Sequence, residues 1–207
     1  MNDDPDSGPA FFDARYAAGE TPWDFGGVPI ALQRFLDQHP GPGRALIPGC
    51  GSGYEIEAFA SAGWDAVGID FSTVAVARAR RRLGQLAGNV VAGDFFCHPF
   101  AERSFDLIYE RTFLCALSPE RRPHYAQRMA TLLTPSGLLC GFFFLGPEKE
   151  PPPYPIRQDQ LNALLGGRFE MVQDHAVEDS LSLFAGKERW QIWRGKIANA
   201  PSMPQET

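Results

Sequence analysis

The sequence is poor in the features that mark membrane proteins and nucleic-acid-binding proteins. No apolar run approaches the roughly 20 residues that a bilayer-spanning helix needs. The first residues, MNDDPDSGP, are acidic and resemble neither a secretory signal nor an organellar transit peptide. The chain has 19 Lys and Arg against 25 Asp and Glu, and its net charge is -6. This balance argues against DNA, RNA or an anionic membrane as the main partner.

Cysteine and histidine are also scarce, at 4 residues each. The cysteines show no CxxC pair and no spacing typical of a metal site; they are Cys50, Cys97, Cys115 and Cys140. Three of them lie in or beside apolar segments, as reduced and partly buried thiols do. None of the histidines stands in a motif that would support a cysteine nucleophile or a metal. We therefore expect a cytoplasmic protein without disulfides and without a bound metal.

Short β-type runs alternate with helical patterns from residue 44 onward. The predicted strands are residues 44–48, 65–70, 89–94, 105–110 and 138–145, with helices predicted at 54–63, 72–86 and 120–133. This alternation predicts an α/β fold whose sheet is mainly parallel and covered by helices on both faces. After a helix at 158–165, two more strand-like runs follow at 169–177 and 188–195 with nothing helical between them. They should pair antiparallel and complete a seven-stranded sheet.

The length of 207 residues suits one domain with a substantial core. Residues 1–10 are polar and are expected to be a flexible N-terminus, and residues 198–207 a disordered tail. Residues 11–197 are expected to form the single domain, which starts with an aromatic-rich segment and an amphipathic helix that ends near His39. The basic cluster RARRRLG, at residues 78–84, falls in a helical pattern and is expected to face solvent.

Three successive strand ends carry residues that suit a nucleoside. The first strand runs into Gly49-Cys50-Gly51-Ser52-Gly53, where the third glycine comes one position too early for the G-x-G-x-x-G motif of dinucleotide folds. Asp70 ends the second strand, and a carboxylate there can accept hydrogen bonds from both hydroxyls of a ribose. Asp94 ends the third strand and is followed by Phe95 and Phe96, which offer an apolar wall for a base. Together these strand ends favour a nucleoside cofactor with a small polar tail.

These motifs and several others resemble those of class I S-adenosylmethionine-dependent methyltransferases. More narrowly, the chain resembles the thiopurine S-methyltransferase superfamily, which includes the halide and thiol methyltransferases. The segments that carry the resemblance are GETPWDFGGVP (19–29), LIPGCGSGYE (46–55), GIDFS (68–72), GDFF (93–96), YERTFLCALSPERR (109–122) and PPYPI (152–156). The glycine loop is common to the whole class, whereas TPWD together with ERTFLCAL is far more selective. The implied fold is the Rossmann-like fold of this class.

The resemblance also implies which residues bind S-adenosylmethionine. They are Trp23, Gly49, Cys50, Gly51, Asp70, Phe71, Asp94, Phe95, Glu110 and Arg111. Trp23 would pack against the cofactor from residues 11–40, an N-terminal lid and helix segment. The glycine loop would pass along the methionine portion, where only bare backbone fits.

The nucleoside would be held at the next two strand ends. Asp70 would bind the ribose hydroxyls and Phe71 would lie against the adenine. Asp94 and Phe95 would flank the adenine, with Asp94 accepting a hydrogen bond from its amino group. Glu110 and Arg111 would line the amino-acid end, although Glu110 is one methylene longer than the Asp that is usual in the family.

The expected reaction is methyl transfer to a small soft nucleophile, first of all the sulfur of a thiol or thiopurine. A thiol with a pKa near ~8.5 already contains some thiolate at neutral pH, so no catalytic base is required and none is predicted. Tyr154 is a candidate for the acceptor side, with a structural role as its alternative. Other readings are a halide, thiocyanate or other chalcogen-anion methyltransferase, an O- or N-methyltransferase, and a catalytically silent nucleoside-binding protein. The expected partner is a small-molecule methyl acceptor, and the protein is expected to be a monomer.

Overall fold

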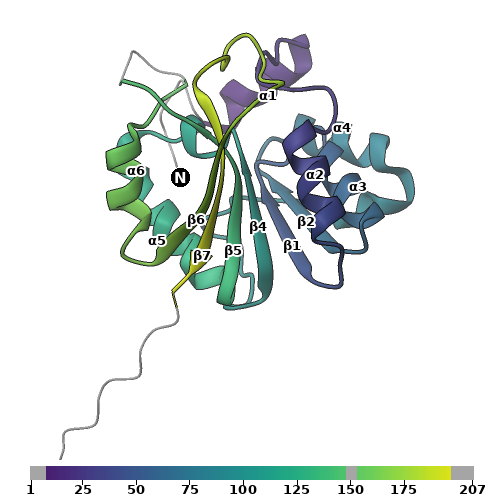
Figure 1. Cartoon of the computed structure of the whole chain (residues 1–207). Helices are drawn as coiled ribbons and strands as arrows, with labels where there is room; N and C mark the ends of the chain where they lie inside the picture. The colour runs from purple at the N-terminus through teal and green to yellow at the C-terminus, as the bar shows by residue number, and fades with distance from the viewer. Residues whose placement is uncertain (1–7, 148–152, 197–207) are drawn as a thin grey trace, which may run out of the picture.

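A computed structural model of the chain describes residues 8–147 and 153–196, and these form one layered α/β structure (Figure 1). Its seven-stranded sheet has the order β3-β2-β1-β4-β5-β7-β6. The strands are β1 (Arg44–Pro48), β2 (Asp65–Asp70), β3 (Val90–Ala92), β4 (Phe105–Arg111), β5 (Leu133–Phe144), β6 (Phe169–Ala176) and β7 (Glu188–Gly195). The first five strands pair in parallel, and β7 pairs antiparallel with both β5 and β6. The predicted mainly parallel sheet with an antiparallel C-terminal pair is confirmed.

Helices cover both faces of this sheet (Figure 1). The α-helices are α1 (Pro9–Ala18), α2 (Ile30–Gln38), α3 (Tyr54–Ser61), α4 (Thr73–Leu83), α5 (Arg122–Leu132) and α6 (Gln158–Leu165), and the short 3-10 helices are η1 (Gly84–Asn89), η2 (Leu114–Ala116) and η3 (Pro119–Arg121). Helices α2, α3 and α4 share one core cluster with the sheet, and α5 and α6 share the other. Leu107 and Tyr109 belong to the first cluster and Ile108 to the second, because successive side chains of a strand point to opposite faces.

The elements follow the sequence pattern closely, with three differences. Helix α1 begins at Pro9, inside the segment expected to be flexible, and the rest of that segment lies outside the described residues. The helix predicted at 72–86 ends at Leu83, since Gly84 takes a positive φ of 56° that breaks the α-helical run. Strand β5 starts five residues earlier than predicted, at Leu133. The tail at 198–207 also lies outside the described residues.

Ser72 is the N-cap of α4. Its side chain accepts a hydrogen bond from the backbone N–H of Ala75. Among the described residues, no helix combines the length and the apolar character that crossing a membrane requires.

Candidate functional site

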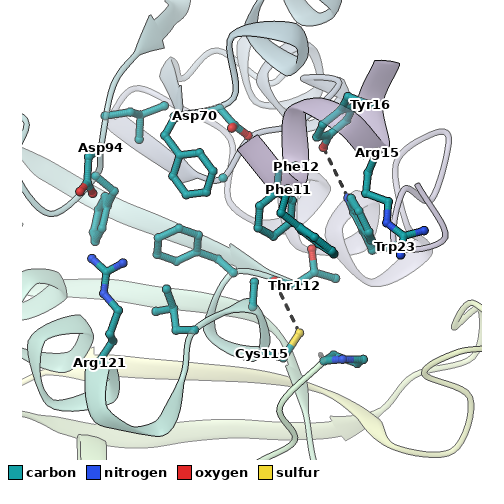
Figure 2. A pocket seen from close by; sticks show the side chains of 18 of the residues that line it. Phe11, Phe12, Arg15, Tyr16, Trp23, Asp70, Asp94, Thr112, Cys115 and Arg121 are labelled. Atoms are coloured by element: carbon teal, nitrogen blue, oxygen red, sulfur yellow. Dashed lines mark hydrogen bonds between the residues drawn. The ribbon is translucent and has the colours of Figure 1, made fainter. Parts of the chain in front are cut away.

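Two adjoining cavities lie where the parallel strands end. The larger has a volume of about 270 Å³ and lies beside the carboxyl ends of β1, β2 and β3 (Figure 2). The smaller has a volume of about 50 Å³ and lies against the glycine loop. Four residues line both cavities and so mark the place where they meet; these are Tyr16, Trp23, Gly49 and Thr112. This is the edge at which open parallel sheets bind their ligands.

The glycine loop lines the smaller cavity through bare backbone. Gly49 and Gly51 have positive φ values of 61° and 50°. A Cβ on Gly49 would come within 2.8 Å of the Phe113 ring, and a Cβ on Gly51 within 2.6 Å of the Tyr16 hydroxyl. Neither position can therefore accept a side chain without displacing a wall of the site. Cys50 between them also lines the smaller cavity and is only 5% exposed, and burial raises the pKa of its thiol well above the usual value.

Asp70 lines the larger cavity with a carboxylate that the backbone holds in place. One oxygen accepts a hydrogen bond from Gly51 N at 3.0 Å, and the other accepts one from Ser72 N at 2.9 Å. Burial raises the pKa of Asp70 to about 6. The carboxylate is thus ionised at neutral pH and keeps free lone pairs that can accept from hydroxyl groups. Phe71 follows it in the wall of the cavity.

Asp94 and Phe95 line the same cavity from the loop after β3. Asp94 accepts a hydrogen bond from Phe96 N at 2.8 Å, which fixes the carboxylate at the start of this loop. The Phe96 ring stacks on Phe113 at an interplanar angle of 23°, and Phe95 is only 3% exposed. The sequence-predicted nucleoside residues are therefore brought together around one aromatic-walled cavity.

Arg111 at the end of β4 is a buried cation that faces the smaller cavity. Its side chain is only 8% exposed, and its Nε and Nη1 atoms have no hydrogen-bond partner among the described residues. The guanidinium carbon lies 4.6 Å from the centroids of the Phe25 and Phe142 rings. An unpaired buried charge is costly, so the site is suited to an anionic ligand group that pairs with it.

Acidic groups complete the smaller cavity. Asp24 and Glu55 line it together with Arg111. Burial raises the pKa of Glu55, and the nearby Arg111 opposes this rise. A cation flanked by carboxyl groups complements a zwitterion, which is the form of a free amino-acid group at neutral pH. The smaller cavity therefore suits a ligand group that carries both charges.

Glu110 is turned away from both cavities. Its carboxylate accepts hydrogen bonds from Phe113 N, Leu114 N and the Tyr125 hydroxyl at 2.9 to 3.0 Å, and the side chain is only 1% exposed. These bonds hold the loop that carries Phe113 in the cavity wall. The placement disfavours the predicted contact of Glu110 with the cofactor.

Comparison with known proteins decides the family. A sequence model of the family described as thiopurine S-methyltransferase matches residues 7–197. The chain belongs to this family. It is 38% identical over 186 residues to "Probable thiol methyltransferase 2" of Arabidopsis thaliana, a match that covers 86% of this chain and 82% of that protein. It is 33% identical to "Thiocyanate methyltransferase 1" of Brassica oleracea, with 85% and 80% covered.

A solved structure shows the same fold. The Burkholderia thailandensis 1,6-didemethyltoxoflavin-N1-methyltransferase, determined with S-adenosylhomocysteine bound, superposes with a TM-score of 0.75 over 91% of this chain and 87% of that chain. Its sequence is only 19% identical, so this likeness concerns the fold alone. The predicted family, the Rossmann-like fold and the dependence on S-adenosylmethionine are confirmed, and the protein is a methyltransferase of the thiopurine S-methyltransferase family. The roles of the individual residues stay predictions.

Several residues of the methyltransferase site were not found from the sequence. Phe11, Phe12 and Tyr16 line the larger cavity from α1, and the spacing of aromatic residues at 12 and 16 was the available signal of a helix face. Trp23, which was predicted, lines both cavities and donates from Nε1 to the Tyr16 hydroxyl at 3.5 Å (Figure 2). The aromatic N-terminal segment thus supplies one wall of the site.

Arg82, from the basic cluster expected to face solvent, supports the glycine loop. Its Nε donates to Ser52 O at 2.9 Å and its Nη2 to Gly53 O at 2.6 Å, and its Nη1 bonds to Glu57. The guanidinium also lies 4.4 Å from the centroid of the Tyr54 ring. For Arg82 the expectation of a solvent-facing side chain is wrong, because its guanidinium donates hydrogen bonds to backbone carbonyls of the glycine loop.

The described residues that line the larger cavity include no histidine or lysine. Cys115 lies in its wall and donates from Sγ to Thr112 O at 3.5 Å (Figure 2). Burial raises the pKa of the Cys115 thiol far above its usual value, which makes it a poor nucleophile. Tyr154, the candidate for the acceptor side, lines neither cavity and bonds from its backbone N–H to Cys115 O. Within the described part of the chain, no group of three or more potential ligands could hold a metal ion.

Proposed function

We propose that this methyltransferase acts on a small thiol, which reacts as its thiolate. The residues shared by the two cavities mark where the sulfonium of the cofactor would lie, since the methionine end and the nucleoside end meet there. Asp70, Phe71, Asp94 and Phe95 take up the nucleoside side of the larger cavity. The acceptor then has the remaining part, called here the acceptor compartment and lined by Phe11, Arg15, Cys115, Leu117, Pro153, Leu183 and Phe184.

The observation that carries the proposal is the chemistry of this compartment. Its walls are mostly apolar, and among its described residues none is acidic and none is a histidine or lysine. Nothing there can take a proton from an alcohol or an amine at neutral pH. A thiol needs no such base, because a pKa near ~8.5 leaves a fraction of thiolate in neutral solution. Arg15, the charged member of the lining set, is ion-paired with Glu20 at 2.9 Å, which offsets its charge.

The cofactor supplies a methyl group on a positively charged sulfur, and the chain supplies position and exclusion of water. Arg111 and the glycine loop hold the amino-acid end, Asp70 holds the ribose, and the aromatic residues close the site. Alignment of two reactants in a dry cavity can contribute on the order of 7–11 kcal/mol to lowering a barrier. In this arrangement the reactivity of the acceptor itself, rather than a side-chain base, sets the rate.

A second candidate is thiocyanate or another small soft anion. The identity of 33% to a protein named for thiocyanate methylation supports it, and so do the apolar walls of the acceptor compartment. Thiopurines are larger and need more of the cavity, so we place them third. O- and N-methylation is disfavoured because the compartment offers no base.

The test is turnover with matched acceptors. Purified protein is incubated with S-adenosylmethionine and separate thiols, thiopurines, thiocyanate, halides, phenols and amines, and release of S-adenosylhomocysteine is measured. A Gly51→Ala variant, whose new Cβ displaces the Tyr16 hydroxyl in the wall of the site, gives the background rate. We expect the fastest release with a small aromatic thiol. Release with thiocyanate or halide alone would select the second candidate, and release only with phenols or amines would refute the proposal.

We further propose that the protein works as a cytoplasmic monomer on small molecules and not on nucleic acid. The net charge of -6 disfavours a polyanionic partner. The free cysteines Cys50, Cys97, Cys115 and Cys140 suit a reducing compartment. Light scattering on the purified protein tests the monomer directly.

A further inference from the structure

Helix α1 lines the larger cavity and lies outside both core clusters. Phe11, Phe12 and Tyr16 of this helix line the cavity, and Tyr16 is its one buried residue. Among the described residues, neither core cluster contains a member of α1. The two core clusters are therefore complete without α1, which contacts the wall of the cavity and α4.

Among the described residues, Tyr16 of α1 accepts a hydrogen bond from Trp23, and Asp13 makes the polar contacts of α1 with α4. Asp13 accepts hydrogen bonds from Ser72 Oγ at 2.6 Å, from Val74 N at 3.2 Å and from Thr73 Oγ1 at 3.1 Å. These groups form the N-terminus of α4, where the partial positive charge of a helix end favours an anion. The neighbouring Phe12 ring makes edge contacts with Phe71 at 5.6 Å.

The contacts of Asp13 lead through Ser72 to Asp70, the residue that is predicted to bind the ribose. Ser72 is fully buried, and its hydroxyl bonds to Asp13 while its backbone N–H donates to the Asp70 carboxylate at 2.9 Å. One residue thus joins the helix that covers the cavity to the carboxylate that faces into it. When Asp13 is in place, α1 is closed and Ser72 is held in the position that orients Asp70.

We propose that Asp13 is the latch that holds α1, a part of the expected N-terminal lid, against the cavity, and that this latch opens when cofactor and product exchange. Asp13 is a positioning residue: it acts through Ser72 and through the placement of Phe11, Phe12 and Tyr16. The inference concerns cofactor exchange and is independent of the acceptor on which the proposed function depends.

The experiment compares Asp13→Asn with the wild type, using S-adenosylmethionine and S-adenosylhomocysteine as the probes. The variant keeps the size of the side chain but loses its charge and one acceptor oxygen. We expect S-adenosylhomocysteine to dissociate about tenfold faster, which corresponds to about 1.4 kcal/mol. The Kd of S-adenosylmethionine should rise by a similar factor, kcat at saturation should not fall, and the melting temperature should stay within about 2 °C.

Amide hydrogen exchange measures the opening of α1 directly. In the ligand-free Asp13→Asn variant the amides of α1 should exchange faster than in the wild type, while those of the core strands should not change. Asp37→Asn, which alters an exposed carboxylate on α2, is the matched control and should match the wild type in every measurement.

Two results would refute the proposal that Asp13 is a latch. One is an unchanged dissociation rate together with unchanged exchange of α1. The other is a parallel fall of kcat and melting temperature, which would make Asp13 a general stabilising residue. Since the binding measurements use no methyl acceptor, a failure of thiol turnover would count against the proposed function and leave this test standing.

Discussion

The buried carboxyl group of Glu110 should make the stability of this methyltransferase fall as the pH rises. Burial raises the pKa of Glu110 to about 7, from an ordinary value of 4.5, and hydrogen bonds from Leu114 N, Tyr125 and Phe113 N oppose the rise. Between these two values the folded state holds a proton that the unfolded state has lost. The free energy of unfolding therefore decreases with pH over this window, by about 1.4 kcal/mol per pH unit at most.

The magnitude follows from the two pKa values. Integration of the linkage relation from pH 5 to pH 8 gives a loss of about 2.5 kcal/mol from this one group. A Glu110→Gln variant has no proton to lose. Its amide oxygen still accepts from Phe113 N and Leu114 N, and its NH2 group donates to the Tyr125 hydroxyl oxygen. Between pH 5 and pH 8 the free energy of unfolding of the variant should therefore fall by about 2.5 kcal/mol less than that of the wild type. At pH 8 the variant should be more stable than the wild type.

Urea unfolding followed by circular dichroism at pH 5 and pH 8 measures the effect. Asp70 and the other titrating groups are present in both proteins, so their contributions cancel in the difference between wild type and variant. Glu170→Gln, at an exposed position of β6, is the control and should keep the pH dependence of the wild type. Equal pH dependence in the Glu110→Gln variant and the wild type would refute the reasoning.

Four further outcomes are expected. Arg111→Met should weaken S-adenosylmethionine binding at least about tenfold in calorimetry, because the variant removes the guanidinium that faces the smaller cavity; an unchanged affinity would contradict this. Gly51→Ala should abolish detectable binding in the same assay, since the new Cβ displaces the Tyr16 hydroxyl. Trp23→Ala should raise the Kd of the cofactor far more than it lowers the free energy of unfolding, and an unchanged Kd would remove Trp23 from the site. The rate of methyl transfer to a series of thiols should rise with pH up to the pKa of each thiol, whereas one common pKa for all of them would reveal a protein base.

Much of the site could be predicted because its residues lie in short segments that each end or directly follow one strand. The glycine loop, Asp70 and Asp94 each follow a strand, and parallel strands bring their carboxyl ends to one edge. The orientation of Glu110 could not be predicted in this way. It lies beside Arg111 in β4, and successive side chains of a strand point to opposite faces, but the sequence does not show which of the two faces carries the smaller cavity.

The contributions of α1 and Arg82 were missed for a different reason. Both act on the site through contacts between segments far apart in the chain, such as Asp13 with Ser72 and Arg82 with Ser52. A run of basic residues looks the same whether it faces water or carbonyl oxygens. The spacing of the aromatic residues in α1 is typical of a helix face, but it does not show which surface that helix packs against.

The position of β7 in the sheet has a consequence for the order in which the chain folds during synthesis. β7 lies between β5 and β6 and is the last strand to be made. Until it leaves the ribosome, β6 has no neighbour with which to pair, and β5 presents an open edge of unsatisfied backbone groups. From the synthesis of β5 until that of β7, the nascent chain therefore carries an exposed sheet edge, and completion of the described sheet waits for β7 to enter between β5 and β6.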